Sequence, residues 1–432
     1  MSRLSLFPLM PTLPTLPIPP AAPTEPLSSR RIVLAGALTL AVAMGIGRFA
    51  FTPLLPLMMQ EGLIDAAGGA ELAAANYLGY LAGALTAARL AGRPLRLVQA
   101  CLLAITLLTA GAGLVHSQPL WVGLRFAAGV ASAWAMVGIS SWCLTVLAQR
   151  GQGALGALVF GGVGGGIMLA GGLAWWAHAG SAQALWLELA GAAGIMTAVV
   201  VSLTHSAGTR PSISDGMPAA AAPAASSATA SIHPPAPARL PAGSWPLVIC
   251  YGSFGFGYIL PATFLPAMAR ALIDDPLRFG LAWPLFGLAA LVSTGVAVRS
   301  LQQWPPLRTW AVCQGAVGLG AALPLISQTS AAIALAALLV GGTFVVATLI
   351  GLQQARAQAP HNPAPLLARM TAAFALGQIL GPLVVRALSG LVLQWGPLGP
   401  WGGLQITSAA AALLMAATAG WLWRQGAPAP AG

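Results

Sequence analysis

Four ionisable side chains interrupt long apolar stretches of this sequence: Arg48, Arg125, Glu188 and Arg386. A charge inside a membrane-spanning segment costs about 2.5–3.5 kcal/mol on insertion scales, so such residues are by default functional. Arginine stays protonated in proteins. If the four side chains face one cavity, three positive charges and one negative charge predict that it attracts anions and repels cations.

The four residues allow different roles. We predict that Arg48 contacts the substrate. Arg125 either contacts the substrate or donates to backbone carbonyls where a helix is interrupted. Arg386 is a further substrate contact, or else a structural residue whose guanidinium extends to the membrane surface. Glu188 is the only one of the four that can bind and release a proton, so we predict proton coupling there, with arginine pairing or an interfacial position as the alternative.

Polar residues near these charges recur at helical spacing, which places them on common helix faces. The sets are Gln378, Pro382 and Arg386; Asn76 and Tyr80; and Tyr251 and Tyr258. We predict that Gln378, Asn76, Tyr80, Tyr251 and Tyr258 line the substrate site. For Asn76 and Tyr80, hydrogen bonds that only hold helices together are an equally open alternative.

The elements that must position these residues are membrane-spanning helices. The 432 residues are 57% hydrophobic and only 6% charged, against about 25% charged in average globular chains, which excludes a soluble enzyme. Apolar runs of about 20 residues match the thickness of a bilayer core. They predict an all-α polytopic membrane protein with twelve helices at 32–58, 72–92, 97–115, 119–148, 154–176, 184–204, 245–269, 280–298, 308–326, 331–355, 367–393 and 402–424.

The net charge of +11 has a topological explanation. All 19 basic residues are arginines, and they form no basic stripe that would predict nucleic-acid binding. Most of them fall in the connections on one side of the predicted helices. The positive-inside rule then predicts that both termini are cytoplasmic, in a cell (inner) membrane.

Low-complexity segments divide the chain. Residues 1–31 are a Pro-rich stretch that we interpret as a disordered cytoplasmic tail, and residues 205–243 form an Ala/Pro/Ser linker. The linker separates six-helix bundles at 32–204 and 244–424, and 425–432 is a second cytoplasmic tail.

The two bundles contain an internal repeat. GIGRFAFTPLLPLM begins at Gly45 and GFGYILPATFLPAM begins at Gly255, so an offset of 210 equates the segments and pairs Gly47 with Gly257. Because each copy has six helices, both copies have the same orientation, which predicts a parallel repeat about an axis along the membrane normal.

These features resemble the major facilitator superfamily of secondary transporters, over residues 30–424. The loop residues Arg93 and Arg96 are similar to the superfamily's G-R-x-x-R signature between helices 2 and 3, although Arg89 stands where an aspartate is usual. The phrases GIGRFAFTPLLPLM, NYLGY and GQILGP resemble the YbfB/YjiJ-like branch. The resemblance implies two pseudo-symmetric six-helix bundles and transport by alternating access.

The repeat is broken at Arg48, whose equivalent is Tyr258. Organophosphate antiporters of the superfamily carry arginines on both equivalent helices. A single arginine favours a singly charged or aromatic acid that also stacks on Tyr258.

Glycines and one proline provide close helix approaches and kinks. We assign this conformational and packing role to Gly45, Gly47, Gly255, Gly257, Gly161, Gly165, Gly377, Gly381 and Pro382.

No catalytic residue, metal site or cofactor is expected. The five histidines fall in predicted loops or at helix ends, and HExxH, Walker A and GxSxG motifs are missing. We therefore expect a monomeric transporter, not an enzyme, whose partners are a small-molecule substrate, protons or a counter-anion, and the lipid bilayer. The alternatives are an exporter of amphipathic drug-like compounds and a membrane sensor that binds a ligand without moving it.

Overall fold

The computed structural model describes residues 27–87, 94–176, 180–205, 243–272, 280–300, 304–359, 364–395 and 402–426. Apart from their edges, the predicted tails and linker lie outside these ranges. Within the described ranges every regular element is a helix, as the predicted fold class requires.

The first half contains six helical spans, the first of which has three parts. Its elements are α1 (Ser29–Leu40), η1 (Ala41–Phe49), α2 (Phe51–Gln60), α3 (Ala66–Thr86), α4 (Pro94–Leu114), α5 (Gln118–Gln149), the short turn η3 (Gly153–Leu155), α6 (Gly156–Trp176) and α7 (Ala182–Thr204). The second half contains α8 (Trp245–Leu272), α10 (Ala282–Ser300), α11 (Pro306–Ile326), α12 (Ser330–Gln358), α13 (Ala364–Trp395) and α14 (Gly402–Gln425).

Eleven of the twelve predicted spans begin and end within about three residues of the observed helices. The second span is different, because α3 begins at residue 66 and not at 72. Asp65 causes the earlier start: its carboxylate accepts a hydrogen bond from the Gly68 amide at 2.7 Å and so caps the helix.

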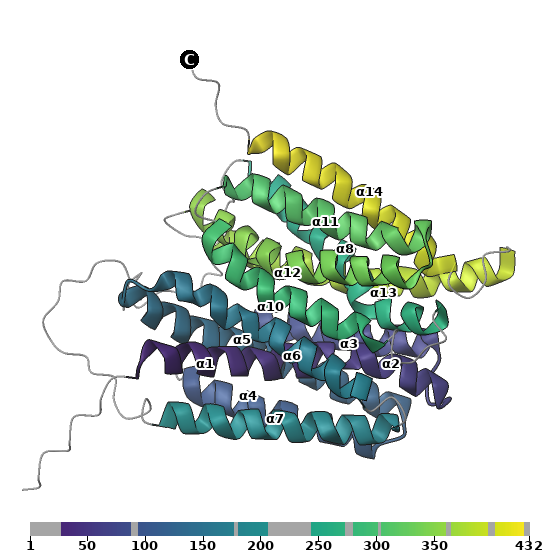
Figure 1. Cartoon of the computed structure of the whole chain (residues 1–432), viewed down its shortest axis with the longest axis horizontal. Helices are drawn as coiled ribbons and strands as arrows, with labels where there is room; N and C mark the ends of the chain where they lie inside the picture. Colours follow the sequence, from purple (N-terminus) through teal and green to yellow (C-terminus); the bar gives the residue numbers. More distant parts are fainter. Residues whose placement is uncertain are drawn as a thin grey trace, which may run out of the picture.

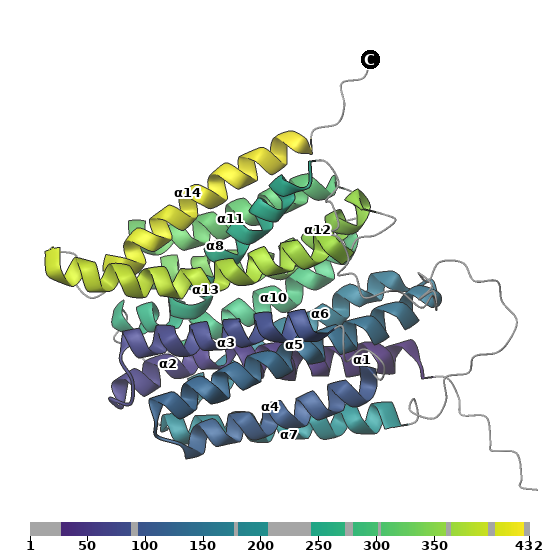
Figure 2. The same cartoon turned by 180° about the vertical axis from the view of Figure 1, so that it is seen from behind.

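The same packing pattern occurs in both halves. In the first half α3 packs on α5, α4 on α5 and α7, and α6 on α1 and η1; in the second half the pairs are α10 on α12, α11 on α12 and α14, and α13 on α8. Figures 1 and 2 show the two bundles side by side, the second half above the first. The halves meet where α6 packs on α10, α3 on α13, and α2 on α8.

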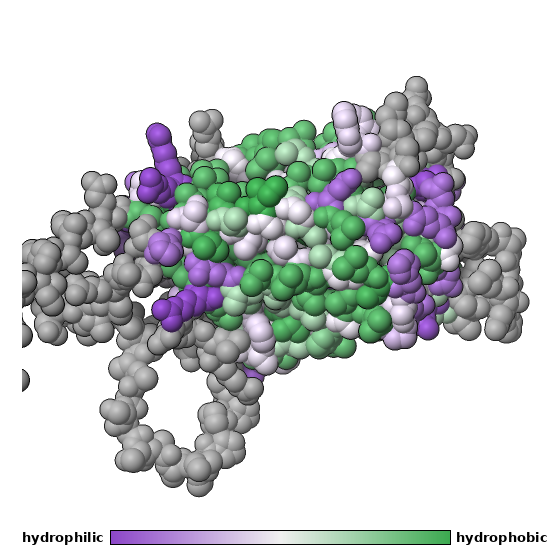
Figure 3. All heavy atoms as spheres, turned by 90° about the horizontal axis from the view of Figure 1, so that it is seen from below, coloured by the Kyte–Doolittle hydropathy of each residue, from purple (hydrophilic) through white to green (hydrophobic). Residues whose placement is uncertain are grey.

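An apolar belt surrounds the middle of the molecule. Figure 3 shows this belt with hydrophilic residues gathered at its two ends. Within the described ranges ten helices are long and apolar enough to cross a membrane, and α10 contains a shorter apolar stretch. The chain is a multi-pass membrane protein. We call the end where α1 begins and α14 ends the termini side (the left of Figure 1), and the other end the opposite side.

The first span is not a continuous α-helix. Residues 41–49 form the π-helix η1, a rare geometry that is frequent at functional sites. It contains Gly45, Gly47 and Arg48. A Cβ on Gly45 would lie 2.4 Å from the Gly166 Cα, so η1 and α6 touch backbone to backbone.

The predicted packing glycines have different surroundings. A Cβ would meet another atom at less than 3.0 Å at Gly45, Gly47, Gly161, Gly255, Gly257, Gly377 and Gly381. Pro382 lies inside α13 and is buried. Gly165 is the exception, because a Cβ there would meet nothing within 4 Å. The glycines of α6 that pack directly against the backbone of α1 and η1 are Gly162 and Gly166.

Candidate functional site

Arg48 lies at the centre of the molecule, between the two halves. Its side chain is only 2% exposed, and its Nη2 donates a hydrogen bond to Gln378 Oε1 on α13. The guanidinium carbon lies 4.2 Å from the centroid of the Tyr80 ring and 5.2 Å from that of Tyr77, which is cation–π geometry. The arginine side chain of η1 is therefore held by an amide and by aromatic faces.

Gln378 connects Arg48 to Tyr258. Its Nε2 donates to the Tyr258 hydroxyl at 2.5 Å while its Oε1 accepts from Arg48. The repeat equates Arg48 with Tyr258, and the structure joins these two non-identical equivalents through one glutamine. Both ends of the Gln378 amide are bonded, so this side chain fixes the position of the guanidinium.

No carboxylate of the described ranges neutralises Arg48. Glu61, Asp65 and Glu71 accept hydrogen bonds at helix ends, and Glu188 is exposed. The Nε of Arg48 has no hydrogen-bond partner. A buried cation with an unused N–H donor is therefore present at the interface between the halves, where an anion would satisfy it.

The side chain of Arg125 contacts backbone carbonyls. Its Nη1 donates to the Gly47 carbonyl at 3.2 Å and its Nη2 to the Arg48 carbonyl at 3.0 Å. These carbonyls belong to η1, so Arg125 holds the backbone on either side of the Arg48 side chain. Asn76 adds to the same network, because its Nδ2 donates to the Gly47 carbonyl at 3.3 Å and to the Arg125 carbonyl at 2.9 Å. Both residues position Arg48 through its backbone.

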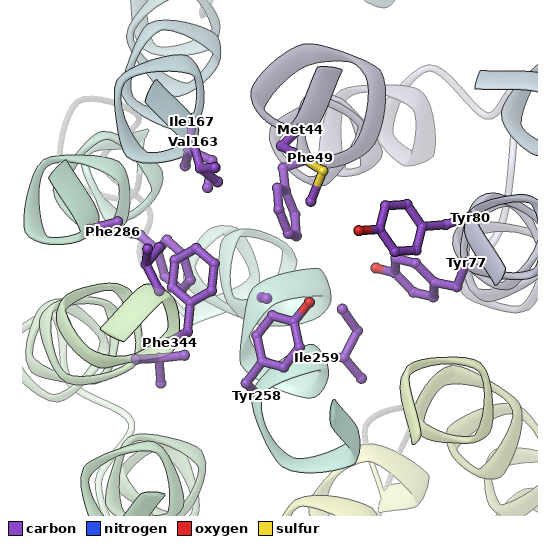
Figure 4. Packing of buried hydrophobic residues seen from close by; sticks show 14 of the residues in the cluster. Met44, Phe49, Tyr77, Tyr80, Val163, Ile167, Tyr258, Ile259, Phe286 and Phe344 are labelled. Atoms are coloured by element: carbon purple, nitrogen blue, oxygen red, sulfur yellow. The ribbon is translucent and has the colours of Figure 1, made fainter. Parts of the chain in front are cut away.

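A cavity of about 90 Å³ borders the Arg48 side chain. Its lining comes from both halves and contains three of the predicted tyrosines. The lining residues are Met44, Arg48, Phe49, Tyr80, Met136, Phe160, Val163, Tyr251, Tyr258, Phe344, Val345, Thr348, Leu352, Thr371 and Phe374. Figure 4 shows the hydroxyls of Tyr77, Tyr80 and Tyr258 pointing toward the middle of this region. The Tyr80 hydroxyl donates to the Met136 sulfur at 2.9 Å.

A larger cavity of about 450 Å³ lies on the termini side, lined by residues of α5, α6, α10 and α12. Its lining includes the exposed residues Gln353 and Arg356, so it opens to solvent there. Phe160 and Leu352 line both this cavity and the central one. These two side chains therefore lie between the central cavity and the larger one.

The opposite side is closed by contacts between the halves. Thr52 Oγ1 donates to the Ala262 carbonyl at 3.0 Å, and Arg270 donates to Gln60. Both pairs are 210 residues apart, so each joins a residue to its own equivalent in the repeat. Such contacts lie at the pseudo-symmetry axis, where α2 and α8 meet.

Two of the four predicted charges are not at this site. Arg386 and Glu188 have exposed side chains, so the expectation that all four charges face one cavity is corrected. Gln378 and Arg386 are eight residues apart, and eight steps of about 100° leave them roughly 80° apart around the helix. Gln378 is completely buried. Arg96 is also exposed, and Arg93 lies outside the described residues.

The position of Glu188 leads to a prediction. Glu188→Gln is expected to leave substrate transport and its pH dependence unchanged, because the exposed carboxylate does not contact the buried Arg48 network. The measurement is uptake into proteoliposomes at pH 5.5, 7.0 and 8.5, compared with the wild type. A loss of the pH dependence in the variant would establish Glu188 as the coupling residue and contradict the expectation.

Some site residues were not singled out from the sequence. Phe254 lies between Tyr251 and Tyr258 on one face of α8, and the spacing i, i+3, i+7 is a helical signal that could have identified it. Phe344 and Phe374 carry no such local signal, because only the packing of α12 and α13 against α8 brings them to Tyr258.

In the parts of the chain that the structure describes, no group of three or more His, Cys, Asp or Glu side chains lies close enough together to hold a metal ion. The four cysteines are buried and unpaired.

Comparisons with known proteins agree with the helical membrane fold described above. A family model described as "Uncharacterised MFS-type transporter YbfB" matches residues 40–419. No curated protein matches the sequence significantly. A solved structure of a mutant nucleoside transporter, NupG, superposes with a TM-score of 0.65 at 13% identity, covering 91% of this chain and 99% of that one. A D-xylose–proton symporter superposes with a TM-score of 0.60 at 13% identity, covering 90% and 96%. At these identities the two structures establish the fold alone.

Proposed function

This chain belongs to the major facilitator superfamily of transporters, in the family represented by YbfB, and from the geometry at Arg48 we propose that its substrate is a small organic anion with one negative charge. In this proposal the anion binds between the halves, with Arg48 as its counter-ion, and crosses the membrane by alternating access. Tyr258 and Tyr80 contribute to the same site.

The observation that carries the proposal is the state of Arg48. Its guanidinium is buried, borders a cavity, and has an N–H without a partner. A buried unpaired charge is costly, and an anionic ligand supplies the missing partner. Arg125 is already engaged by two backbone carbonyls, so one arginine is left for the substrate, which favours one negative charge over a phosphate dianion.

The lining argues against a strongly polar substrate. Among its described residues it presents one charged group, a few hydroxyls, and otherwise aromatic and aliphatic side chains. Nucleosides and sugars, which the two similar structures are named for, offer many hydroxyls that need hydrogen-bond partners. We therefore do not transfer either substrate to this chain.

The two cavities indicate the path by which the substrate reaches Arg48. The opposite side is closed at α2 and α8, and the large cavity opens to the termini side, with Phe160 and Leu352 as the last barrier before Arg48. Arg356 lines the large cavity, where its positive charge attracts anions toward the site. Because the positive-inside rule assigns the termini to the cytoplasm, we interpret this conformation as facing the cytoplasm of a cell with the protein in its inner membrane.

Coupling in this proposal does not need a carboxylate at the site. A proton travels bound to the substrate, or a second anion returns through the same site while the first one leaves. The protein acts as a monomer in either case.

The proposal is tested by thermal unfolding of the purified protein with matched solutes. Because a ligand stabilises the folded state by RT ln(1 + [L]/Kd), a concentration of 100 Kd adds about 2.7 kcal/mol. We expect stabilisation by benzoate or lactate, and none by choline, xylose or uridine. Stabilisation by choline, xylose or uridine, with none by the anions, would contradict the proposal.

A second candidate function is export of amphipathic compounds, which the aromatic lining of the central cavity favours. Stabilisation by neutral aromatic compounds that equals stabilisation by anions would support it. A sensor would bind anions in the same screen, but it would show no uptake into proteoliposomes.

A further inference from the structure

The central cavity is lined by one charged residue and by aromatic side chains from both halves, and the nearly parallel rings among them belong to the second half. Arg48 lies on η1 of the first half, whereas Tyr251, Tyr258, Phe344 and Phe374 lie on α8, α12 and α13 of the second half. We infer that this site takes a planar aromatic monocarboxylate, with the carboxylate on Arg48 and the ring against the second half. The inference rests on the proposed function, since it assumes that Arg48 receives the negative charge.

The second half supplies a set of nearly parallel rings. The Tyr258 ring lies 5.7 Å from Phe344 with an interplanar angle of 3°, and 5.5 Å from Phe374 with an angle of 6°. Aromatic pairs of this kind gain free energy beyond the burial of their area. A flat ring can add to such an array without tilting the existing rings, whereas a puckered aliphatic ring cannot stack in this way.

The size of the cavity limits the ligand to a single ring. Its volume is about 90 Å³, and an apolar cavity of about 150 Å³ takes up one benzene molecule. Met44 and Met136 line the same space, and methionine side chains rearrange easily. Small movements of these two side chains supply the remaining volume for one ring, but not for two fused rings.

The distribution of charge limits the ligand to one carboxylate. Arg48 is the only charged residue in the described lining. A second carboxylate on the far side of the ring would be placed among aromatic faces, which carry negative partial charge. Such a dianion would lose its hydration without gaining a cation.

The test is isothermal titration of the full-length protein in nanodiscs with five probes: benzoate, cyclohexanecarboxylate, benzamide, terephthalate and acetate. Benzoate is expected to bind about three- to tenfold more tightly than cyclohexanecarboxylate, which has the same charge and a similar size. Benzamide has the same ring without the charge, and terephthalate has a second charge. Both are expected to bind at least about tenfold more weakly than benzoate. Acetate, which lacks the ring, is expected to bind more weakly too.

A pair of variants separates ring recognition from general packing. Phe344→Leu is expected to reduce the ratio of benzoate to cyclohexanecarboxylate affinity to about one, because Tyr258 loses one parallel neighbour. Phe126→Leu is the matched control, since the Phe126 side chain is 38% exposed on α5 and is not part of the lining. It should keep the wild-type ratio.

The outcomes distinguish this inference from the proposed function. Equal binding of benzoate and cyclohexanecarboxylate, both far tighter than benzamide, would overturn the aromatic preference and leave an anion transporter. Benzamide binding as tightly as benzoate would overturn the anion proposal itself. Terephthalate or acetate binding more tightly than benzoate would overturn the inference of one ring with one charge, as would a lack of binding by all five probes.

Discussion

Arg48→Met is expected to weaken benzoate binding by about 30-fold to 5,000-fold, because removing one partner of a buried hydrogen-bonded charge pair costs about 2–5 kcal/mol. Methionine keeps most of the side-chain volume, so the variant tests the charge and not the packing. The unliganded variant should unfold at the same temperature as the wild type or higher, since it no longer buries an unpaired cation. Titration calorimetry and thermal unfolding measure both effects.

Two further variants control this experiment. Arg48→Lys keeps the positive charge but loses the planar guanidinium, which can donate to Gln378 and to a carboxylate at the same time. We therefore expect a benzoate affinity between those of the wild type and Arg48→Met. Arg386→Met removes an arginine of α13 whose side chain is exposed, and it should leave the affinity unchanged. If Arg386→Met loses binding while Arg48→Met retains it, the site is not the cavity at Arg48.

The sequence alone is enough to single out Arg48 as a candidate because two independent signals coincide there. The residue is a charge in an apolar segment, and it is the position at which the repeat of 210 residues loses its match, opposite Tyr258. The first signal is local in the sequence, and the second is found by aligning the chain with itself. The spans were predictable for the same reason, because length and apolarity are properties of a continuous segment.

The network that holds Arg48 was not predictable in the same way. The π-helix at residues 41–49 has no characteristic amino-acid composition, and its Gly47 carbonyl accepts hydrogen bonds from Arg125 and Asn76, which are far away in the sequence. Sequence reasoning could state that Arg125 either contacts substrate or binds backbone. It could not choose, because the choice depends on where the Gly47 and Arg48 carbonyls point.

Predictions of which residues share a helix face were wrong where small errors in the angle per residue accumulate along the helix. Arg386 was placed on the face of Gln378 by a repeat of four residues, but a helix has 3.6 residues per turn, and the difference over two turns moves the side chain to the exposed surface. In the same way, spacing on α6 allows two small-xxx-small stripes, Gly161 with Gly165 and Gly162 with Gly166. Only packing decides which of them meets the first span.

That packing leads to the largest expected effect on stability. A Cβ on Gly162 would lie 1.9 Å from the Ala37 carbonyl oxygen and 2.6 Å from the Ala37 Cα, and neither backbone atom can rotate away. Gly162→Ala must therefore push α6 away from α1. Because α6 also packs on α10 of the second half, the shift opens one of the contacts between the bundles. Overpacking of this kind costs about 1–3 kcal/mol or more.

Gly165→Ala is the matched control, three residues further along the same helix. A Cβ there meets nothing within 4 Å, so the substitution is expected to be neutral or to stabilise the helix by up to about 1 kcal/mol. Thermal unfolding followed by tryptophan fluorescence should show a clearly lower midpoint for Gly162→Ala and an unchanged or higher one for Gly165→Ala. Equal midpoints would mean that α6 does not lie directly against α1. Since Gly166 on the same stripe contacts the backbone of η1 at Ala41, that result would also remove the support on which the position of Arg48 depends.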